Sequence, residues 1–268
     1  LPIYGIDRDV AGVEGRSGIT LTGVMLLAAC GSSESASTTS GSGSSSVVAP
    51  TVTAPPIVSP EKLDVGSYPT TPPAPLGKAG TPEAGVAAEA RRMAEFVIGP
   101  WDVDPTLITP YLSTNYVLTT PLLLSQLGPD TVAAAAQNHG FVNGFASARR
   151  SDQAVLVHAV LRFPDPGAAT AAAAAMSDAA GASPIRGEMP QPTQIPGHPD
   201  ARAVTYSFTP QDANQPWAVV RSFAPHGPFV FMDLAQSVAG LEAAGGLVAK
   251  AVDAQSPVID QFTPTPLS

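Results

Sequence analysis

The chain has 268 residues, of which only 13% are charged, and its 22 acidic and 13 basic side chains give a formal net charge of −9. This negative charge argues against binding to nucleic acid and against electrostatic adhesion to anionic lipid. Cys30 is the single cysteine, which excludes internal disulfides. In the part of the chain that follows it, a thiol enzyme or a cysteine-ligated metal is excluded as well.

Residues 18–29 form a short apolar stretch, about half as long as the ~20 residues that a membrane-spanning helix needs. Arg16 precedes the stretch, and Leu27-Ala28-Ala29-Cys30 ends it. Such an arrangement is typical of a signal peptide, and its last four residues resemble the lipoprotein motif of bacteria. We therefore expect residues 1–29 to be a lipoprotein signal peptide. Cys30 would then carry the lipid that holds the protein at the outer face of the cytoplasmic membrane, although an ordinary buried thiol is the alternative.

Three segments follow the predicted anchor. Residues 30–60 are rich in Ser, Thr, Gly, Ala and Pro with Glu34 as their only charge, which predicts a linker. Residues 61–262, about 200 in number, are enough to bury a core without disulfides and predict a single domain. Residues 263–268 contain Thr-Pro-Thr-Pro and predict the start of a linker to a second domain.

Helical signals are strongest at Thr81-Pro82-Glu83, which combines a capping hydroxyl, a proline at the first helical position and an acid in the first turn. They predict a helix to about residue 97. Apolar periodicity and alanine content predict further helical segments at residues 121–127, 129–139, 168–180 and 241–252.

Strand signals begin near residue 153, where alternating apolar side chains predict a strand to residue 163. Residues 202–208 predict a second strand, and residues 217–223 and 229–234 predict a hairpin. Residues 183–199 contain five prolines and predict a loop. This order of elements favours an α+β domain, with a mostly antiparallel sheet and helices packed on one face.

Motifs for catalysis or metal binding are scarce. The histidines are scattered without metal-ligand spacing: His139, His158, His198 and His226. His158, beside Arg162 on the predicted strand, suits a polar pocket wall or a satisfied histidine of the sheet. Ser147 and Ser183 lack the G-x-S-x-G context of a serine hydrolase. We therefore predict no catalytic residue, no metal ligand and no cofactor.

Other side chains allow two interpretations each. Asp102 and Asp104, beside Trp101, suit a cation site or a turn with a helix cap. Arg149 and Arg150 suit an anionic headgroup or glycan, or the solvated start of a strand. Aromatic residues in segments predicted as irregular would line a cleft or belong to the core: Trp101, Tyr111, Tyr116, Phe141 and Phe145.

Five stretches follow one another in order: Leu63-Asp64-Val65-Gly66-Ser67-Tyr68, Glu89-Ala90-Arg91-Arg92-Met93-Ala94, Val103-Asp104-Pro105, Gly144-Phe145-Ala146-Ser147-Ala148-Arg149 and Asp260-Gln261-Phe262-Thr263-Pro264-Thr265-Pro266. Together they resemble an uncharacterised family of actinobacterial, mycobacterial-type membrane-anchored lipoproteins. The resemblance extends from about residue 63 to the end. It implies an envelope location and a second related domain after Pro266, and it transfers no catalytic residue.

The sequence thus predicts a lipid-anchored cell-envelope protein and leaves its activity open. The first interpretation is a non-enzymatic binding module for a lipid, a glycolipid or an envelope partner. The second is a scaffold or sensor subunit of a membrane complex. An envelope hydrolase is less favoured, because Ser, His and Asp side chains would have to converge in the fold. No nucleic-acid partner is expected, and a protein partner is left unspecified.

Overall fold

The computed structural model describes residues 79–210 and 214–267. The predictions for residues 1–29, residues 30–60 and Cys30 lie outside these ranges. Among the described helices, none has the length and apolar character needed to cross a membrane.

A seven-stranded antiparallel sheet forms the centre of the domain, with the strand order β1-β2-β3-β7-β6-β5-β4. The strands are β1 (Thr109–Leu118), β2 (Asn143–Arg150), β3 (Ala154–Arg162), β4 (Gln191–Ile195), β5 (His198–Phe208), β6 (Trp217–His226) and β7 (Phe229–Ser237). The predicted α+β class and the antiparallel sheet are confirmed. The predicted hairpin is also present as β6 and β7, whose strands are longer than expected.

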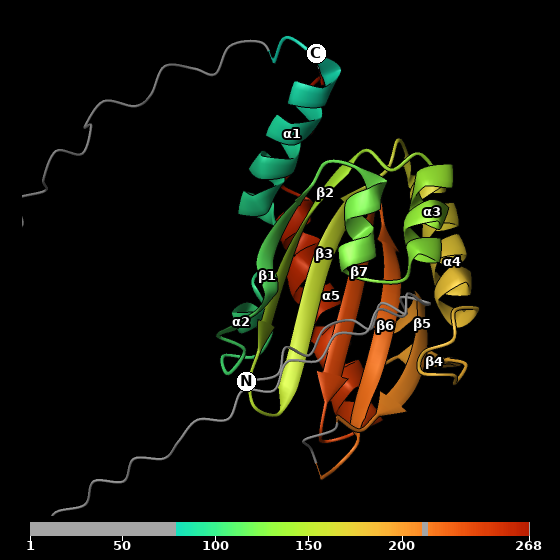
Figure 1. Ribbon diagram of the computed structural model, residues 1–268. Coiled ribbons are helices and arrows are strands. Elements are labelled where there is room, and N and C mark those ends of the chain that lie inside the picture. The colour runs from blue at the N-terminus through green and yellow to red at the C-terminus, as the bar shows by residue number, and fades with distance from the viewer. Residues whose placement is uncertain (1–78, 211–213, 268) are drawn as a thin grey trace, which may run out of the picture. The chain divides into compact units, whose positions relative to one another are not determined.

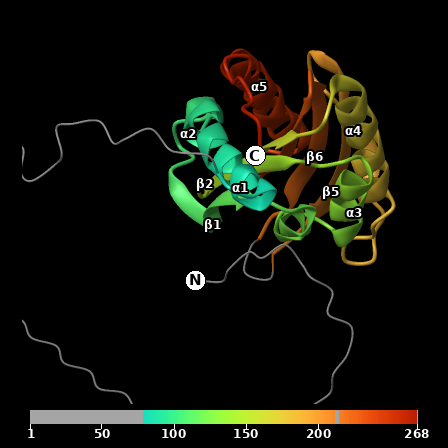
Figure 2. The same ribbon diagram turned by 90° about the horizontal axis from the view of Figure 1, so that it is seen from above.

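Helices cover both faces of the sheet (Figures 1 and 2). One face carries α1 (Pro82–Met93), the 3₁₀ helix η2 (Ala94–Phe96), α2 (Pro100–Val103) and α5 (Leu241–Ile259); the other carries the 3₁₀ helix η3 (Pro121–Gln126), α3 (Asp130–Asn138) and α4 (Pro166–Gly181). The sequence predicted helices on one face alone. The difference arises because the central strands are apolar on both sides, and such strands need a layer on each face.

Strand β3 shows the two-sided burial most clearly. Val157 and Leu161 belong to a hydrophobic cluster with α3 and α4, while Leu156 and Val160 belong to a second cluster with α5. Residues of both clusters are almost inaccessible to solvent along β3 and β7. The domain therefore has two cores that share one sheet.

Local signals explain how the helices begin. The hydroxyl of Thr81 accepts a hydrogen bond of 3.2 Å from the amide of Ala84, and Pro82 occupies the first helical position, as predicted. The carboxylate of Asp165 accepts a hydrogen bond of 2.9 Å from the amide of Ala168 and caps α4 in the same way. Each cap satisfies a backbone N–H that the helix itself leaves without a partner.

Strands β1, β2 and β4 were not predicted. In β1, Leu112 and Thr114 have φ values of 50° and 70° within a break in pairing between Pro110 and Asn115, which destroys the alternation expected of a strand. The loop prediction for residues 183–199 is wrong over β4 and the start of β5. Because β4 is an edge strand, it tolerates Pro192, which cannot donate to a ladder.

The two-core arrangement makes a prediction about stability. Leu156→Ala and Leu161→Ala remove fully buried side chains from opposite faces of β3. We expect each to lower the free energy of unfolding by about 2–5 kcal/mol in urea titrations. Leu122→Ala, at a side chain that is 75% exposed, is the control and should cost less than about 0.5 kcal/mol. An unchanged free energy of unfolding for Leu156→Ala or Leu161→Ala would contradict the description of two cores that share one sheet.

Candidate functional site

A buried polar network lies between the sheet and α5. His158 and Asp233 are cross-strand partners on β3 and β7, and His158 Nδ1 lies 2.7 Å from Asp233 Oδ1. His158 Nε2 lies 2.9 Å from Oε1 of Gln255 on α5. All of these side chains have no exposed surface. Gln255 continues the network, because its Oε1 accepts from the amide of Ile98 and its Nε2 donates to the carbonyl of Phe96.

The network favours the protonated form of His158. Gln255 Oε1 is an acceptor, so His158 Nε2 is a donor, and Nδ1 faces a carboxylate. Burial by itself would lower the pKa of His158, but the charge of Asp233 and the hydrogen bonds to Asp233 and Gln255 outweigh it and raise the pKa above 6.5. Below this raised pKa, the imidazolium and Asp233 form a buried ion pair, which Gln255 links to α5.

The fold also brings serines into line with this pair. Ser147 is the cross-strand partner of His158, and Ser222 is the partner of Asp233. A serine hydrolase would use the free ring nitrogen of the histidine to take the serine proton. Here Gln255 holds that nitrogen, and the Ser147 hydroxyl donates to Asn115 Oδ1. Both ring nitrogens of His158 are therefore occupied, and neither is free to accept a proton from Ser147 or Ser222.

The remaining predicted candidates are dispersed. His198 and His226 lie 3.2 Å and 2.7 Å from Asp253 and from Asp260 near the C-terminal end of α5, and His139 ends α3. Within residues 79–210 and 214–267, no group of three or more His, Cys, Asp or Glu side chains could hold a metal ion.

The two carboxylates beside Trp101 act as caps. Asp102 accepts from the amide of Gly99 at 2.8 Å, and Asp104 accepts from the amide and the hydroxyl of Thr106. Trp101 is 44% exposed, with the guanidinium of Arg149 at 5.0 Å from its ring. This geometry is the turn and helix cap that the sequence allowed as one interpretation.

The five aromatic candidates do not meet in one cleft. Tyr111 and Tyr116 belong to the core beneath α3 and α4, and Phe141 packs against the same core. Phe145 packs against the core on the α5 side, and Trp101 lies on the surface of α2. Tyr111 and Tyr116 lie in β1, and Phe145 in β2, which corrects the prediction of irregular segments.

A different group of polar side chains gathers on the sheet face that carries α3 and α4. We name it the tyrosine–arginine cluster, and its members are Tyr111, Arg150, Tyr206, Arg221 and Gln236. They come from five strands, namely β1, β2, β5, β6 and β7. Tyr111 hydrogen-bonds to Gln236 and interacts electrostatically with Tyr206 and Arg150, and Tyr206 hydrogen-bonds to Arg221.

Arg221 is the most unusual member because its guanidinium is only 2% exposed. Its Nη1 donates to the carbonyl of Leu127 at 2.9 Å, and its other partner is the hydroxyl of Tyr206. Both acceptors are uncharged, and the ion pairs among the described residues do not include Arg221. Burial lowers the pKa of Arg221, and Tyr206 opposes this effect. A Cβ on Gly128 would lie 2.5 Å from Nη1, so a larger residue there would displace the guanidinium.

The other members of the cluster are neutral or partly exposed. Burial, together with nearby Tyr206 and Tyr116, raises the pKa of Tyr111 to about 12, although Arg150 and Gln236 oppose this shift. Tyr111 therefore presents an uncharged hydroxyl. Phe208 and Trp217, which are cross-strand partners, pack partly buried against the same core. A positive charge with hydroxyl and amide groups and aromatic surfaces suits an anionic amphiphile or sugar.

Sequence patterns did not predict this cluster. One signal was present, because Val219, Arg221 and Phe223 occupy alternate positions of a strand and the middle one is a cation. Alternation placed Arg221 on a buried face, where an arginine without an acid is rare.

The His158 pair makes a prediction about pH. Because the folded-state pKa is raised above 6.5, the pair contributes its full stability below about pH 6.5 and loses it as the pH rises through the raised pKa. His158→Gln should cost about 3–5 kcal/mol, because it leaves Asp233 buried without a counter-charge. The double variant His158→Gln/Asp233→Asn removes both titrating groups and should therefore remove this pH dependence. Urea unfolding of the wild type and the double variant from about pH 6 to about pH 9 tests this window.

His139→Gln is the matched control, because His139 caps α3 away from the buried pair, and this variant should keep the pH dependence of the wild type. Parallel pH profiles for the wild type and the double variant His158→Gln/Asp233→Asn would contradict the assignment. So would a His158 ring resonance that titrates below pH 6.5 in the folded protein.

The chain is similar to a known protein family and to a solved structure. A search of curated proteins finds no match. Among solved structures, the extracellular domain of PknH from Mycobacterium tuberculosis is similar at 12% identity and a TM-score of 0.42, over 63% of this chain and 96% of that one. The model of a family described as "Domain of unknown function (DUF7373) N-terminal" matches residues 76–268. This match covers most of the chain, and the chain therefore belongs to the DUF7373 family, whose N-terminal domain it contains.

Proposed function

We propose that the protein is a lipid-anchored, non-enzymatic binding module of the cell envelope. We further propose that its tyrosine–arginine cluster takes the anionic headgroup of a lipid or glycolipid. The observation that carries the proposal is the buried guanidinium of Arg221, whose partners are two uncharged oxygens.

A buried charge without a counter-charge is costly, and proteins usually pair such a group or leave it neutral. Arginine stays protonated and offers five N–H donors in a planar fork that matches a carboxylate or a phosphate. In this cluster, the fork contacts Leu127 and Tyr206, and neither of these partners carries a charge. An anion beside Arg221 would supply the missing charge. Because Arg221 itself is only 2% exposed, the anion would approach it past Tyr206 and Arg150, which are partly exposed.

The surroundings favour an amphiphilic ligand over a bare ion. Tyr111, Tyr206 and Gln236 supply neutral polar groups, while Phe208 and Trp217 supply partly buried aromatic surface on the same face. Aromatic faces with a few polar groups are typical of sites for sugars and lipid headgroups.

A non-enzymatic role agrees with the way His158 is used. Its ring contacts Asp233 and Gln255 on both nitrogens, in a place with no solvent access. A general base must reach a proton of the substrate within hydrogen-bond distance. The ligand of this protein would therefore be held and released unchanged.

The anchor is tested by Cys30→Ser in the full chain, expressed in an actinobacterial host. We expect the wild type in the membrane fraction and the variant in the soluble fraction, because two acyl chains on Cys30 supply the membrane affinity. Mass spectrometry should find a diacylglyceryl group on Cys30 of the wild type. Ser44→Ala, in the predicted linker, is the control. A Cys30→Ser protein that stays in the membrane fraction would contradict the anchor.

The ligand is tested by mass spectrometry of organic extracts from the purified full chain. We expect a stoichiometric anionic lipid or glycolipid with the wild type. Arg221→Met should reduce it roughly tenfold to a hundredfold, because a hydrogen bond to a charged group is lost. Tyr206→Phe keeps the shape of the side chain and removes the hydroxyl that contacts Arg221, so it should reduce the ligand with less effect on folding.

Arg202→Met is the matched control, because Arg202 lies exposed on β5 and its loss removes the same charge from the protein. Circular dichroism confirms that each variant is folded. A folded wild type without ligand would contradict the proposal and favour the scaffold or sensor role, for which cross-linking in intact cells is the next experiment. Equal ligand on the wild type and Tyr206→Phe would contradict the assignment of the site.

A further inference from the structure

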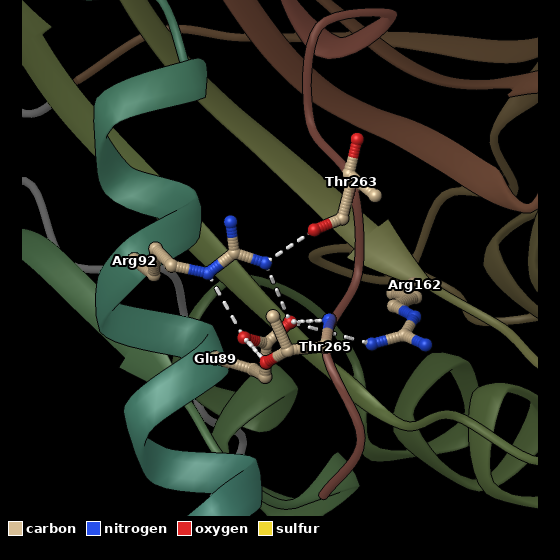
Figure 3. A network of polar contacts seen from close by, with 5 residues as sticks. All are labelled: Glu89, Arg92, Arg162, Thr263 and Thr265. Carbon is tan, nitrogen blue, oxygen red and sulfur yellow. Dashed lines mark hydrogen bonds and ion pairs between the residues drawn. The ribbon is translucent and has the colours of Figure 1, made fainter. Parts of the chain in front are cut away.

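Residues 263–267, which we name the strap, lie along α1 (Figure 3). Phe262 anchors the start of the strap, because it is 5% exposed and its ring centroid lies 5.3 Å from that of Phe96 and 6.3 Å from that of Phe229. The guanidinium of Arg92 covers the same ring at 4.3 Å. The strap therefore begins from a fixed point.

Glu89 of α1 is the main partner of the strap. Its carboxylate is buried, and it accepts hydrogen bonds from the amide of Thr265 at 3.1 Å and from the Thr265 hydroxyl at 2.5 Å. Arg92 donates two hydrogen bonds to the same carboxylate and a third, of 2.6 Å, to the carbonyl of Thr263 (Figure 3). Arg162 Nη1 lies 3.8 Å from Glu89 and adds positive charge on the sheet side.

The strap rests on a surface of α1 that we name the seat, formed by Gly85, Glu89 and Arg92. Gly85 has no side chain, which gives the strap room at this end of the seat. A Cβ on Gly85 would collide with the carbonyl oxygen of Leu267, so the strap touches the bare backbone of α1. The two prolines of the strap, Pro264 and Pro266, have no N–H and favour an extended backbone. Thr265 between them supplies the amide and the hydroxyl that Glu89 accepts.

We propose that α1 carries a peptide-recognition site, formed by Gly85, Glu89 and Arg92, which the strap occupies as an intramolecular latch. The site fits an extended, uncharged segment with a threonine between two prolines. Its occupant is residues 263–267 of this chain, and a free peptide of the same sequence would compete for the same seat.

Simple apolar packing would not explain these contacts. A glutamate is almost never fully buried unless it is paired, and the strap supplies two of the donors that hold Glu89. The seat contacts a carbonyl at Thr263, an amide and a hydroxyl at Thr265, and a carbonyl at Leu267. These contacts run along α1 from its last turn to its first, so the strap directs the chain toward the start of α1.

The experiment uses the full chain with residues 263–267 replaced by glycine and serine, which vacates the seat. A fluorescent peptide with the sequence of residues 260–268 is titrated into it, and anisotropy is recorded. We expect the peptide to bind the vacated chain and to bind the intact chain at least about tenfold more weakly, since the strap competes. Glu89→Gln in the vacated chain should weaken binding by about tenfold or more, because a charged acceptor is lost.

Glu95→Gln is the matched control, because Glu95 is an exposed acid just after α1 with no contact to the strap, and it should leave binding unchanged. A dimer of the intact chain whose strap fills the seat of a second copy would also support the site. A folded, vacated chain that does not bind the peptide would overturn the proposal, as would equal binding by Glu89→Gln. If the vacated chain does not fold, hydrogen exchange in the intact chain decides: an unprotected Thr265 amide overturns the latch, and protection that Glu89→Gln abolishes supports it. These outcomes do not depend on any ligand at Arg221.

Discussion

The ion pair of His158 and Asp233 is the interaction on which the α5 side of the domain depends. Its position in the middle of the sheet removes two charges from water, which is costly, and the close contact between the two side chains offsets part of that cost. Gln255 supports the pair by accepting from His158 and from the backbone of Ile98 while donating to Phe96, whereas Asp233 Oδ2 is buried without a hydrogen-bond partner. The pair therefore specifies the position of α5 and of the segment after α1, because a shift of one residue along β3 would leave both charges without partners.

Arg221 lies on the opposite face of the sheet and has no charged partner among the described residues. Both sites place a cation in a core shared with the central strands, but His158 faces a carboxylate, whereas Arg221 faces the carbonyl of Leu127 and the hydroxyl of Tyr206. A purely structural role would be served as well by a neutral donor, without the cost of a buried charge. This difference between the two faces is the physical reason for our proposal that Arg221, and not His158, contacts a ligand.

The sequence predicted those parts of the fold that depend on local chemistry. Thr81 and Pro82 predict the start of α1, and the apolar alternation from residue 155 predicts β3. The elements that the sequence did not predict depend on their position in the tertiary structure. Strand β1 is hidden by the left-handed backbone at Leu112 and Thr114, and β4 is hidden by Pro192, which only its edge position permits. The tyrosine–arginine cluster could not be assembled from sequence, because its members lie on five strands whose spatial order differs from their order in the chain.

Residues 263–267 are a further segment whose position depends on tertiary contacts. Their Thr-Pro composition is typical of a linker. Composition cannot show that Glu89, which is far away in the sequence, accepts hydrogen bonds from this segment. In the fold, Glu89 lies opposite Thr265, and Gly85 leaves room for Leu267, so this part of the segment is seated on α1. Composition therefore predicted a segment independent of the domain, whereas the hydrogen bonds to Glu89 make residues 263–267 part of the folded domain and let α1 set their direction.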